Sequence, residues 1–445
     1  KVQLYRKILE RLLQLYFNHQ QYAVDFENKL EQSRLETLFG LRAFIGAGQI
    51  LPPDQTPYTS FVSIQSAQTA QLVTEIKASG RMQDIEALVK RLTQPRYPIV
   101  VMHGQSGVGK SSILRAGLVP RLRETTSEGR RTLPVCLDSY GNWISQLTQK
   151  LNQFKADPWE SDELALEAEF SPEMLIDLLV QFTRESYQQI VLILDQFEDF
   201  FSEFPNLEQR KELYIFLRDC LDLPYVKVLL SLREDFLHYL LEWDRHTDLS
   251  IINNDILSKE ARYYLGNFSS QATENLIYQL TEPTGFHPEP ALIAALVDDL
   301  AAETGEVSPI ELQVVGAQLQ RQDITTLEQY AKLGRSPKRQ LLKNFLDSVI
   351  QDCGPENETV AQSVLYLLSE GKNRPLKSLS ELQEPLELAN IDSTPLQLSL
   401  VLDIFIGSGL VFEVPEVSGM RYQLVHDYLA GLVQDQQQPS LIDAL

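Results

Sequence analysis

Hydrophobic residues at the start of the chain recur with the spacing of an amphipathic helix. Charged and polar residues separate the apolar ones, which fall three or four positions apart: Leu4, Ile8, Leu12 and Leu15. This spacing predicts helix within residues 1–45. Glycines and prolines interrupt the pattern between Gly46 and Pro57, which indicates a linker or an ordered loop. Helical spacing returns over residues 64–92.

The middle of the chain alternates short apolar runs with segments of helical periodicity. The runs predict buried strands at Ile99–His103, Leu133–Leu137, Ile190–Leu194 and Val226–Leu232, with Tyr263–Gly266 as a candidate fifth. The helical segments between them are Ser111–Arg123, Trp143–Leu151, Met174–Thr183 and Arg210–Cys220. Strands that alternate with helices predict crossover connections and a parallel sheet covered by helices on both faces.

After about residue 268 the strand pattern gives way to helices. Helical periodicity covers Ala272–Leu280, Ala291–Ala302, Pro309–Gln320, Leu341–Gln351, Val360–Leu368 and Leu396–Phe405. Two strand-like segments follow, Leu410–Val414 and Arg421–Val425, with the turn residues Pro415–Gly419 between them. Helices followed by a hairpin are the elements that a winged-helix domain requires, so we expect one at this end of the chain.

The patterns divide the chain into five parts. At about 150 residues per domain, a chain of 445 residues predicts about three folded domains. The predicted parts are an N-terminal helical segment with its linker (1–60), an α/β core (61–268), a helical lid domain (269–337), a winged-helix domain (338–436) and a C-terminal tail (437–445). The chain does not begin with Met, so we expect it to be a fragment or a processed form of a longer protein.

Composition and charge narrow the classes of protein that fit. Hydrophobic residues make up 43% of the chain and charged residues 22%, which are globular proportions. The three cysteines, Cys136, Cys220 and Cys353, are too few for a disulfide scaffold or a zinc cluster and favour the cytoplasm. No apolar run reaches the ~18–20 residues that a membrane span requires. The formal charge of −22 disfavours a broad nucleic-acid surface, which needs a basic face.

The strongest chemical signal lies between the first predicted strand and the helix after it. Residues 104–111 read Gly-Gln-Ser-Gly-Val-Gly-Lys-Ser and match the phosphate-loop pattern G-x-x-x-x-G-K-[ST] at every fixed position. Such a loop presents backbone N–H groups and a helix N-terminus to phosphate oxygens. We expect Lys110 to reach the β- and γ-phosphates of ATP and Ser111 to ligate Mg²⁺. The predicted binding residues are Gly104, Gln105, Ser106, Gly107, Val108, Gly109, Lys110, Ser111 and Ser112.

A second signal is the acid that ends another apolar run. Ile190–Leu194 is followed directly by Asp195, which we expect to hold the Mg²⁺ shell, usually through water. Glu198 lies three residues further on and is a candidate for orienting or activating the attacking water. An ordinary surface acid in a loop is the alternative interpretation of Glu198.

Arg233 ends the predicted strand Val226–Leu232. Because the carboxyl ends of parallel strands face the ligand crevice, an arginine there is placed to contact a γ-phosphate and so to distinguish ATP from ADP. The alternative is a structural ion pair with Glu234 or Asp235.

Three blocks of sequence resemble those of the STAND ATPases, signal-transduction ATPases with numerous domains, and most closely their bacterial novel-STAND branch. The blocks are Gly104–Leu122, Leu194–Phe201 and Ser231–Leu237, which are similar to that family's phosphate-loop, Walker B and sensor-arginine blocks. The resemblance covers roughly residues 78–432. It implies a P-loop NTPase core, similar to AAA+ proteins, that precedes a helical domain and a winged helix.

Further matches to the family are looser. Gly80-Arg81 resembles its motif near the adenine, although Met82 and Asp84 replace the usual acids. Gly305–Pro309 resembles a region that packs on the base, so Arg81 and Pro309 become candidate nucleotide-binding residues. Val425-His426-Asp427 resembles a Met-His-Asp motif whose histidine touches the β-phosphate of ADP. The resemblance makes His426 a candidate latch of the resting state, with an exposed or core histidine as the alternative.

The resemblance implies a signalling ATPase switched by ATP and ADP. It also implies slow hydrolysis, homo-oligomerisation on activation and an unknown protein or ligand trigger. A role in bacterial antiviral defence is the setting it implies. The alternatives are a DNA-associated AAA+-like ATPase, such as an initiator or transposition regulator, and a nucleotide-binding scaffold that does not hydrolyse. Between Asn390 and Asp435 the one basic residue is Arg421, against six acids, so we do not expect nucleic acid to be a partner.

Overall fold

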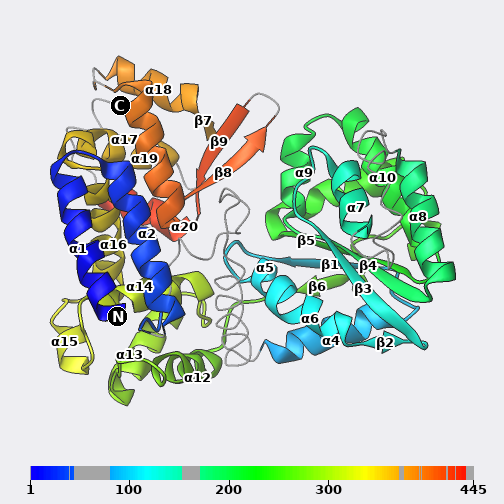
Figure 1. Cartoon of the computed structure of the whole chain (residues 1–445), viewed down its shortest axis with the longest axis horizontal. Helices are drawn as coiled ribbons and strands as arrows, with labels where there is room; N and C mark the ends of the chain where they lie inside the picture. Colours follow the sequence, from blue (N-terminus) through cyan, green and yellow to red (C-terminus); the bar gives the residue numbers. More distant parts are fainter. Residues whose placement is uncertain are drawn as a thin grey trace. The chain divides into compact units, whose positions relative to one another are not determined.

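The computed structural model describes residues 2–39, 41–44, 81–152, 171–369, 375–389, 391, 393–416, 419–425 and 427–436 (Figure 1). The linker expected at Gly46–Pro57 lies outside the described residues, as does the part of the predicted 64–92 helix before Arg81. The chain forms two compact units. We call Gly80–Gly266 with Pro415–Ser418 the sheet unit, and Lys1–Ser79, Asn267–Val414 and Gly419–Leu445 the helical unit.

The sheet unit contains a six-stranded sheet in the order β2-β3-β4-β5-β1-β6. Its strands are β1 (Ile99–Gly104), β2 (Thr126–Ser127), β3 (Arg130–Leu137), β4 (Gln188–Leu194), β5 (Val226–Arg233) and β6 (Arg262–Tyr264). All neighbouring pairs are parallel except β2 with β3. The strands expected from the apolar runs are therefore confirmed. In the parallel pairing of β1 with β5, the last residue of β1, Gly104, is in register with Arg233.

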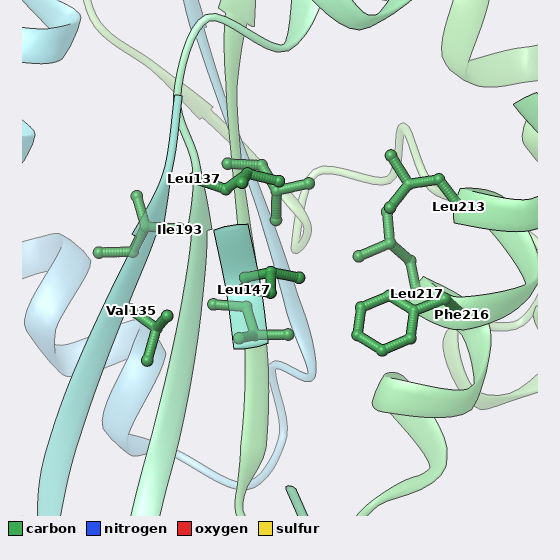
Figure 2. Close-up of a pocket in the computed structure, with 9 residues that line it drawn as sticks. Val135, Leu137, Leu147, Ile193, Leu213, Phe216 and Leu217 are labelled. Carbon is green, nitrogen blue, oxygen red and sulfur yellow. The ribbon is translucent and has the colours of Figure 1, made fainter. Parts of the chain in front are cut away.

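Helices cover both faces of this sheet. They are α4 (Met82–Thr93), α5 (Lys110–Ser112), α6 (Val119–Arg123), α7 (Trp143–Asn152), α8 (Pro172–Glu185), α9 (Phe197–Glu203), α10 (Leu207–Asp222) and α11 (Leu240–His246), with the 3₁₀ segments η5 (Glu234–Tyr239) and η6 (Ser250–Ile252). Figure 2 shows side chains of β3, α7 and α10 facing one another around a small gap. Every residue that lines this gap is apolar, so it is a space within the core and offers no group to a polar ligand.

The helix after the phosphate-loop motif is continuous but widens in its middle. Between α5 and α6 the residues Ile113–Leu118 form a π-helical segment, η3, in which the N–H of Val119 donates to the carbonyl of Leu114. Pro120 follows directly. A proline supplies no N–H and its ring clashes with the carbonyl four residues earlier, and a widened turn accommodates both effects. The predicted helix Ser111–Arg123 is thus confirmed, with a local departure at its proline.

The helical unit contains one continuous hydrophobic core and a three-stranded sheet in the order β7-β9-β8. The strands of this sheet are β7 (Lys377–Ser378), β8 (Val411–Glu416) and β9 (Gly419–Leu424), and the last two residues of β8 are grouped with the sheet unit. The helices of the helical unit are α1 (Val2–Asn18), α2 (Tyr22–Leu38), α12 (Ser270–Thr281), α13 (Pro290–Ala301), α14 (Pro309–Arg321), α15 (Leu327–Ala331), α16 (Pro337–Asp352), η7 (Pro355–Asn357), α17 (Glu358–Leu368), α18 (Leu379–Leu388), α19 (Pro395–Ser408) and α20 (Asp427–Gln436). None of the described helices is long and apolar enough to cross a membrane.

The N-terminal segment packs against the other helices of this unit through aromatic side chains that lie over glycines. A Cβ atom added to Gly316 of α14 would lie 2.4 Å from the ring of Phe44, and one added to Gly407 of α19 would lie 2.5 Å from the ring of Phe26. The backbone N–H of Ala43 also donates to Gln320 Oε1 of α14 at 3.0 Å. Tyr22, Phe26, Ala43 and Phe44 are therefore part of the helical unit's core.

We expect Gly316→Ala to lower the free energy of unfolding by about 1–3 kcal/mol, because the new methyl group overlaps the buried Phe44 ring. Gly431→Ala in α20 is the matched control, since a Cβ there meets nothing within 4 Å. That change should stabilise the chain by about 0.5–1 kcal/mol through its helix propensity. Urea unfolding of both variants tests this packing, and equal stabilities would contradict it.

Candidate functional site

The phosphate-loop residues join the end of β1 to the start of α5. Steric constraints explain why glycines occupy three of these positions. Gly107 and Gly109 adopt φ values of +79° and +91°, in the left-handed region that side chains disfavour. A Cβ at Gly104 would lie 2.3 Å from the carbonyl oxygen of Leu265, just after β6. Each glycine of the motif is therefore needed for the shape of the loop or for the close approach of a neighbouring backbone.

Lys110 bends back over the loop that precedes it. Its Nζ donates to the carbonyl oxygens of Gly104 at 3.0 Å and Gln105 at 2.9 Å, and the residue is 9% exposed. Burial lowers the pKa of this amine, while the nearby carboxylate of Glu198 acts to raise it. The ammonium is thus held inside the loop by two neutral acceptors, which phosphate oxygens can replace.

Asp195 lies directly beyond the end of β4 and is 3% exposed. Its Oδ1 accepts a hydrogen bond from the backbone N–H of Gln196 at 3.0 Å. Its Oδ2 is buried and accepts no hydrogen bond from the described residues. Burial raises the pKa of this carboxyl, and the nearby hydroxyls of Ser111 and Ser231 oppose the rise. A buried carboxylate oxygen beside a serine hydroxyl is a hard-oxygen donor set that suits Mg²⁺.

Arg233 at the end of β5 contacts two acids. Its backbone N–H donates to Glu198 Oε2 at 3.2 Å, which ties the end of β5 to α9. Its guanidinium pairs with Asp235 through Nε–Oδ1 at 3.1 Å and Nη2–Oδ2 at 2.6 Å, and lies over the ring of Phe236. The ion pair with Asp235, one of the two alternatives that the sequence left open, is therefore present.

The charges of the site are concentrated at one edge of the sheet. Burial raises the pKa of Glu198, while Lys110 and Arg233 act to lower it. Burial and the neighbouring Glu198 raise the pKa of Asp199 well above its ordinary value. Asp195 is buried, and Glu198 and Asp199 are half-buried beside two cations, an arrangement typical of a functional site.

Sequence reasoning missed a group of residues that surround Asp195. Arg115 pairs with Asp138 through Nη2–Oδ2 at 3.2 Å, and its Nε lies 3.9 Å from Asp195 Oδ2. The hydroxyl of Tyr140 donates to the backbone carbonyl of Asp195 at 2.7 Å. Asp138 follows β3 directly, so its place at the carboxyl edge was a usable signal. Ser231 could be paired with Asp195 only once the strand register was known.

The structure describes two of the three remaining predicted residues. Arg81 precedes α4 in the sheet unit, where its guanidinium donates to backbone carbonyls at the phosphate loop and beyond β6. Pro309 begins α14 in the helical unit. His426 lies outside the described residues.

The raised pKa of Asp195 predicts how its charge affects stability. Its folded pKa lies above the ordinary 3.8, so this group contributes stability at low pH that is lost as the pH rises through the raised pKa. Asp195→Asn removes the ionisation. We therefore expect the free energy of unfolding of the variant, relative to wild type, to increase between about pH 4 and pH 7. Urea unfolding of both proteins at both pH values, without metal or nucleotide, measures this difference in the free energy of unfolding. A difference that does not change with pH would contradict the prediction.

The sheet and this site together define a class of protein. A parallel sheet with a phosphate loop after β1 and an acid beyond β4 is the core of a P-loop nucleoside triphosphatase. The sequence model of the family "Novel STAND NTPase 1" matches residues 78–431, and the chain belongs to this family. A search of curated proteins found no match.

Solved structures of ORC and Cdc6 proteins are similar to this chain at low sequence identity. The ORC2 protein of Aeropyrum pernix, in ADPNP–ADP complexes, is 14% identical with a TM-score of 0.41, covering 88% of this chain and 99% of its own. The ORC1 protein of the same organism, in complex with DNA, is 16% identical with a TM-score of 0.39, covering 89% and 98%. Cdc6p of Pyrobaculum aerophilum is 15% identical with a TM-score of 0.36, covering 89% and 98%.

Proposed function

We propose that this NTPase is a signalling ATPase that ATP and ADP switch between two states and that hydrolyses ATP slowly. The observation that supports it best is the single sheet edge that gathers Lys110, Asp195, Glu198 and Arg233 around the phosphate loop. These are the cations, the metal ligand and the candidate base that ATP hydrolysis needs. Phosphate release from ATP by the wild-type chain tests the proposal. If the chain released no phosphate, it would be a nucleotide-binding scaffold that does not hydrolyse.

Each residue of the site has a proposed role. The backbone of Gly104–Ser112 binds the phosphates, with Lys110 at the β- and γ-phosphates. Ser111 and Asp195 would hold Mg²⁺, which supplies charge neutralisation on the phosphate oxygens. Glu198 orients and deprotonates the attacking water, and the pKa raised by its burial favours proton uptake. Arg233 contacts the γ-phosphate.

In the proposed switch, two cations leave acceptors within the protein and bind phosphate oxygens instead. Arg233 would leave Asp235 for a γ-phosphate that ATP has and ADP lacks. Lys110 would leave two loop carbonyls for phosphate oxygens. Moving a two-state equilibrium from 1:99 to 99:1 needs about 5.5 kcal/mol of differential affinity. Hydrogen bonds to charged groups contribute about 1.5–3 kcal/mol each, so a few such exchanges reach this value.

The rest of the chain supplies the second half of the proposal. We assign residues 269–337 to a lid and 338–436 to a winged helix, in which His426 holds ADP in the resting state. Arg81 and Pro309 lie near the adenine in this scheme. Exchange of ADP for ATP would release His426 and expose a face for homo-oligomerisation, in response to a protein or ligand trigger. Bacterial antiviral defence in the cytoplasm is the setting that the family resemblance favours.

A DNA-associated ATPase is the second candidate, because such proteins also join a P-loop core to a winged helix. The charge of residues 390–435 argues against it. Their one basic residue, Arg421, is already engaged: its Nη1 donates to the carbonyl of Leu376 at 3.0 Å and lies 3.4 Å from Glu381 Oε2. A mobility-shift assay with duplex DNA at low salt separates the two. We expect no shift, whereas tight binding that salt weakens would favour the DNA-associated function.

A further inference from the structure

Arg81, the first described residue of the sheet unit, joins two distant stretches of backbone. Its Nη2 donates to the carbonyl of Val108 at 3.0 Å and to the carbonyl of Gly266 at 2.7 Å, while Nη1 lies 3.3 Å from Asp84 Oδ2. The residue is 6% exposed. Val108 lies inside the phosphate loop, and Gly266 is the residue at which the chain leaves the sheet unit. One buried guanidinium therefore bonds to both.

The same exit segment is tied to the start of the phosphate loop. The backbone N–H of Leu265 donates to the carbonyl of His103, the residue before Gly104, at 2.8 Å. The carbonyl of Leu265 lies against Gly104 so closely that a Cβ there would be 2.3 Å away. Residues 265 and 266 thus contact the loop at its first glycine and, through Arg81, at Val108.

Two residues further on, the chain is anchored in the helical unit. Phe268 and Val307 exchange both backbone hydrogen bonds, at 2.9 and 2.8 Å. Only Gly266 and Asn267 separate these bonds from those of Leu265. A change in the backbone dihedrals of this short stretch is enough to redirect the chain as it enters the helical unit.

We propose that Arg81 is a positioning residue that couples the phosphate loop to this exit segment. The inference rests on the proposed function, because it needs a nucleotide in the loop. Bound phosphates fix the loop's N–H groups and with them the Val108 carbonyl. Arg81 then holds the Gly266 carbonyl in one place. Because coupling between two sites is reciprocal, movement of the exit segment also changes the affinity for nucleotide.

Arg81→Lys in the full chain tests the coupling, since an ammonium keeps the charge but lacks the rigid plane in which a guanidinium holds its donors. Arg91→Lys is the matched control on α4: its Nη1 donates to the carbonyls of Glu260 at 3.1 Å and Arg262 at 2.7 Å, at the opposite end of β6. The measurements are the affinity for a fluorescent ADP analogue and amide hydrogen exchange over residues 262–268, with and without ADP.

In wild type and in Arg91→Lys we expect ADP to slow exchange at residues 265–268. Arg81→Lys should bind ADP about 10- to 100-fold more weakly and show no slowing at saturating ADP. An Arg81→Lys chain with wild-type affinity and slowing would overturn the inference alone. So would wild type that binds ADP without slowing exchange there, a result that needs no variant. Wild type that binds no ADP would overturn the proposed function as well.

Discussion

Replacing Lys110 with alanine is expected to weaken ATP and ADP binding by about a hundredfold or more while leaving the chain folded. The ammonium is the proposed cation for two phosphates, and hydrogen bonds to charged groups are worth about 1.5–3 kcal/mol each. We expect the variant to fold, because the two bonds of Lys110 to the carbonyls of Gly104 and Gln105 lie within the phosphate loop. Titration with a fluorescent nucleotide measures the affinity, and urea unfolding shows that the variant is folded.

Lys227→Ala is the matched control for this experiment. Lys227 is also a buried lysine of the sheet unit, but its Nζ donates to the carbonyl of Pro95 at 3.0 Å, near the start of β5. Its loss should affect stability and leave nucleotide affinity within about twofold of wild type. Retention of nucleotide binding by Lys110→Ala would contradict the assignment of residues 104–112 as the phosphate site.

Asp195→Asn and Glu198→Gln are expected to separate binding from hydrolysis. Asp195→Asn removes the carboxylate proposed to hold Mg²⁺, and Glu198→Gln removes the proposed base, a role worth about 10²–10⁴-fold in rate. Each variant should lose turnover by about a hundredfold or more and still bind ATP, because Lys110 and the loop remain. Phosphate release under saturating ATP and Mg²⁺ measures the loss.

Glu242→Gln controls for the loss of an acid elsewhere in the sheet unit, since Glu242 of α11 pairs with Arg210 of α10. It should turn over ATP at nearly the wild-type rate. Full turnover by Glu198→Gln would restore the alternative that Glu198 is an ordinary acid. Full turnover by Asp195→Asn would contradict the proposed metal site itself.

The strands that carry this site could be predicted because they are buried on both faces. Ile190–Leu194 and Val226–Leu232 are continuous apolar runs, and a run of that length with a polar residue at its end indicates a parallel strand and its functional edge. By contrast, β2 has only two residues and is defined by its antiparallel pairing with β3. No local pattern in the sequence predicts this pairing. The strand β7 depends in the same way on β9.

The side chains around the site were less predictable than the strands. That Ser231 lies beside Asp195 follows from the pairing of β4 with β5, and Arg81 reaches Gly266 across 185 positions of sequence. The choice for Arg233 between an acid and a phosphate depends on what the site holds, which the sequence alone does not state. The contact of Phe44 with Gly316 likewise joins residues far apart in the chain.

If the nucleotide state switches the chain between a resting and an assembled form, the mass of the protein in solution must change with the nucleotide. Light scattering coupled to size exclusion should be run on the wild-type chain with ADP and then with a non-hydrolysable ATP analogue, each with Mg²⁺. We expect a monomer of about 50.7 kDa with ADP and a larger, defined oligomer with the analogue. The same mass in both nucleotides would contradict it.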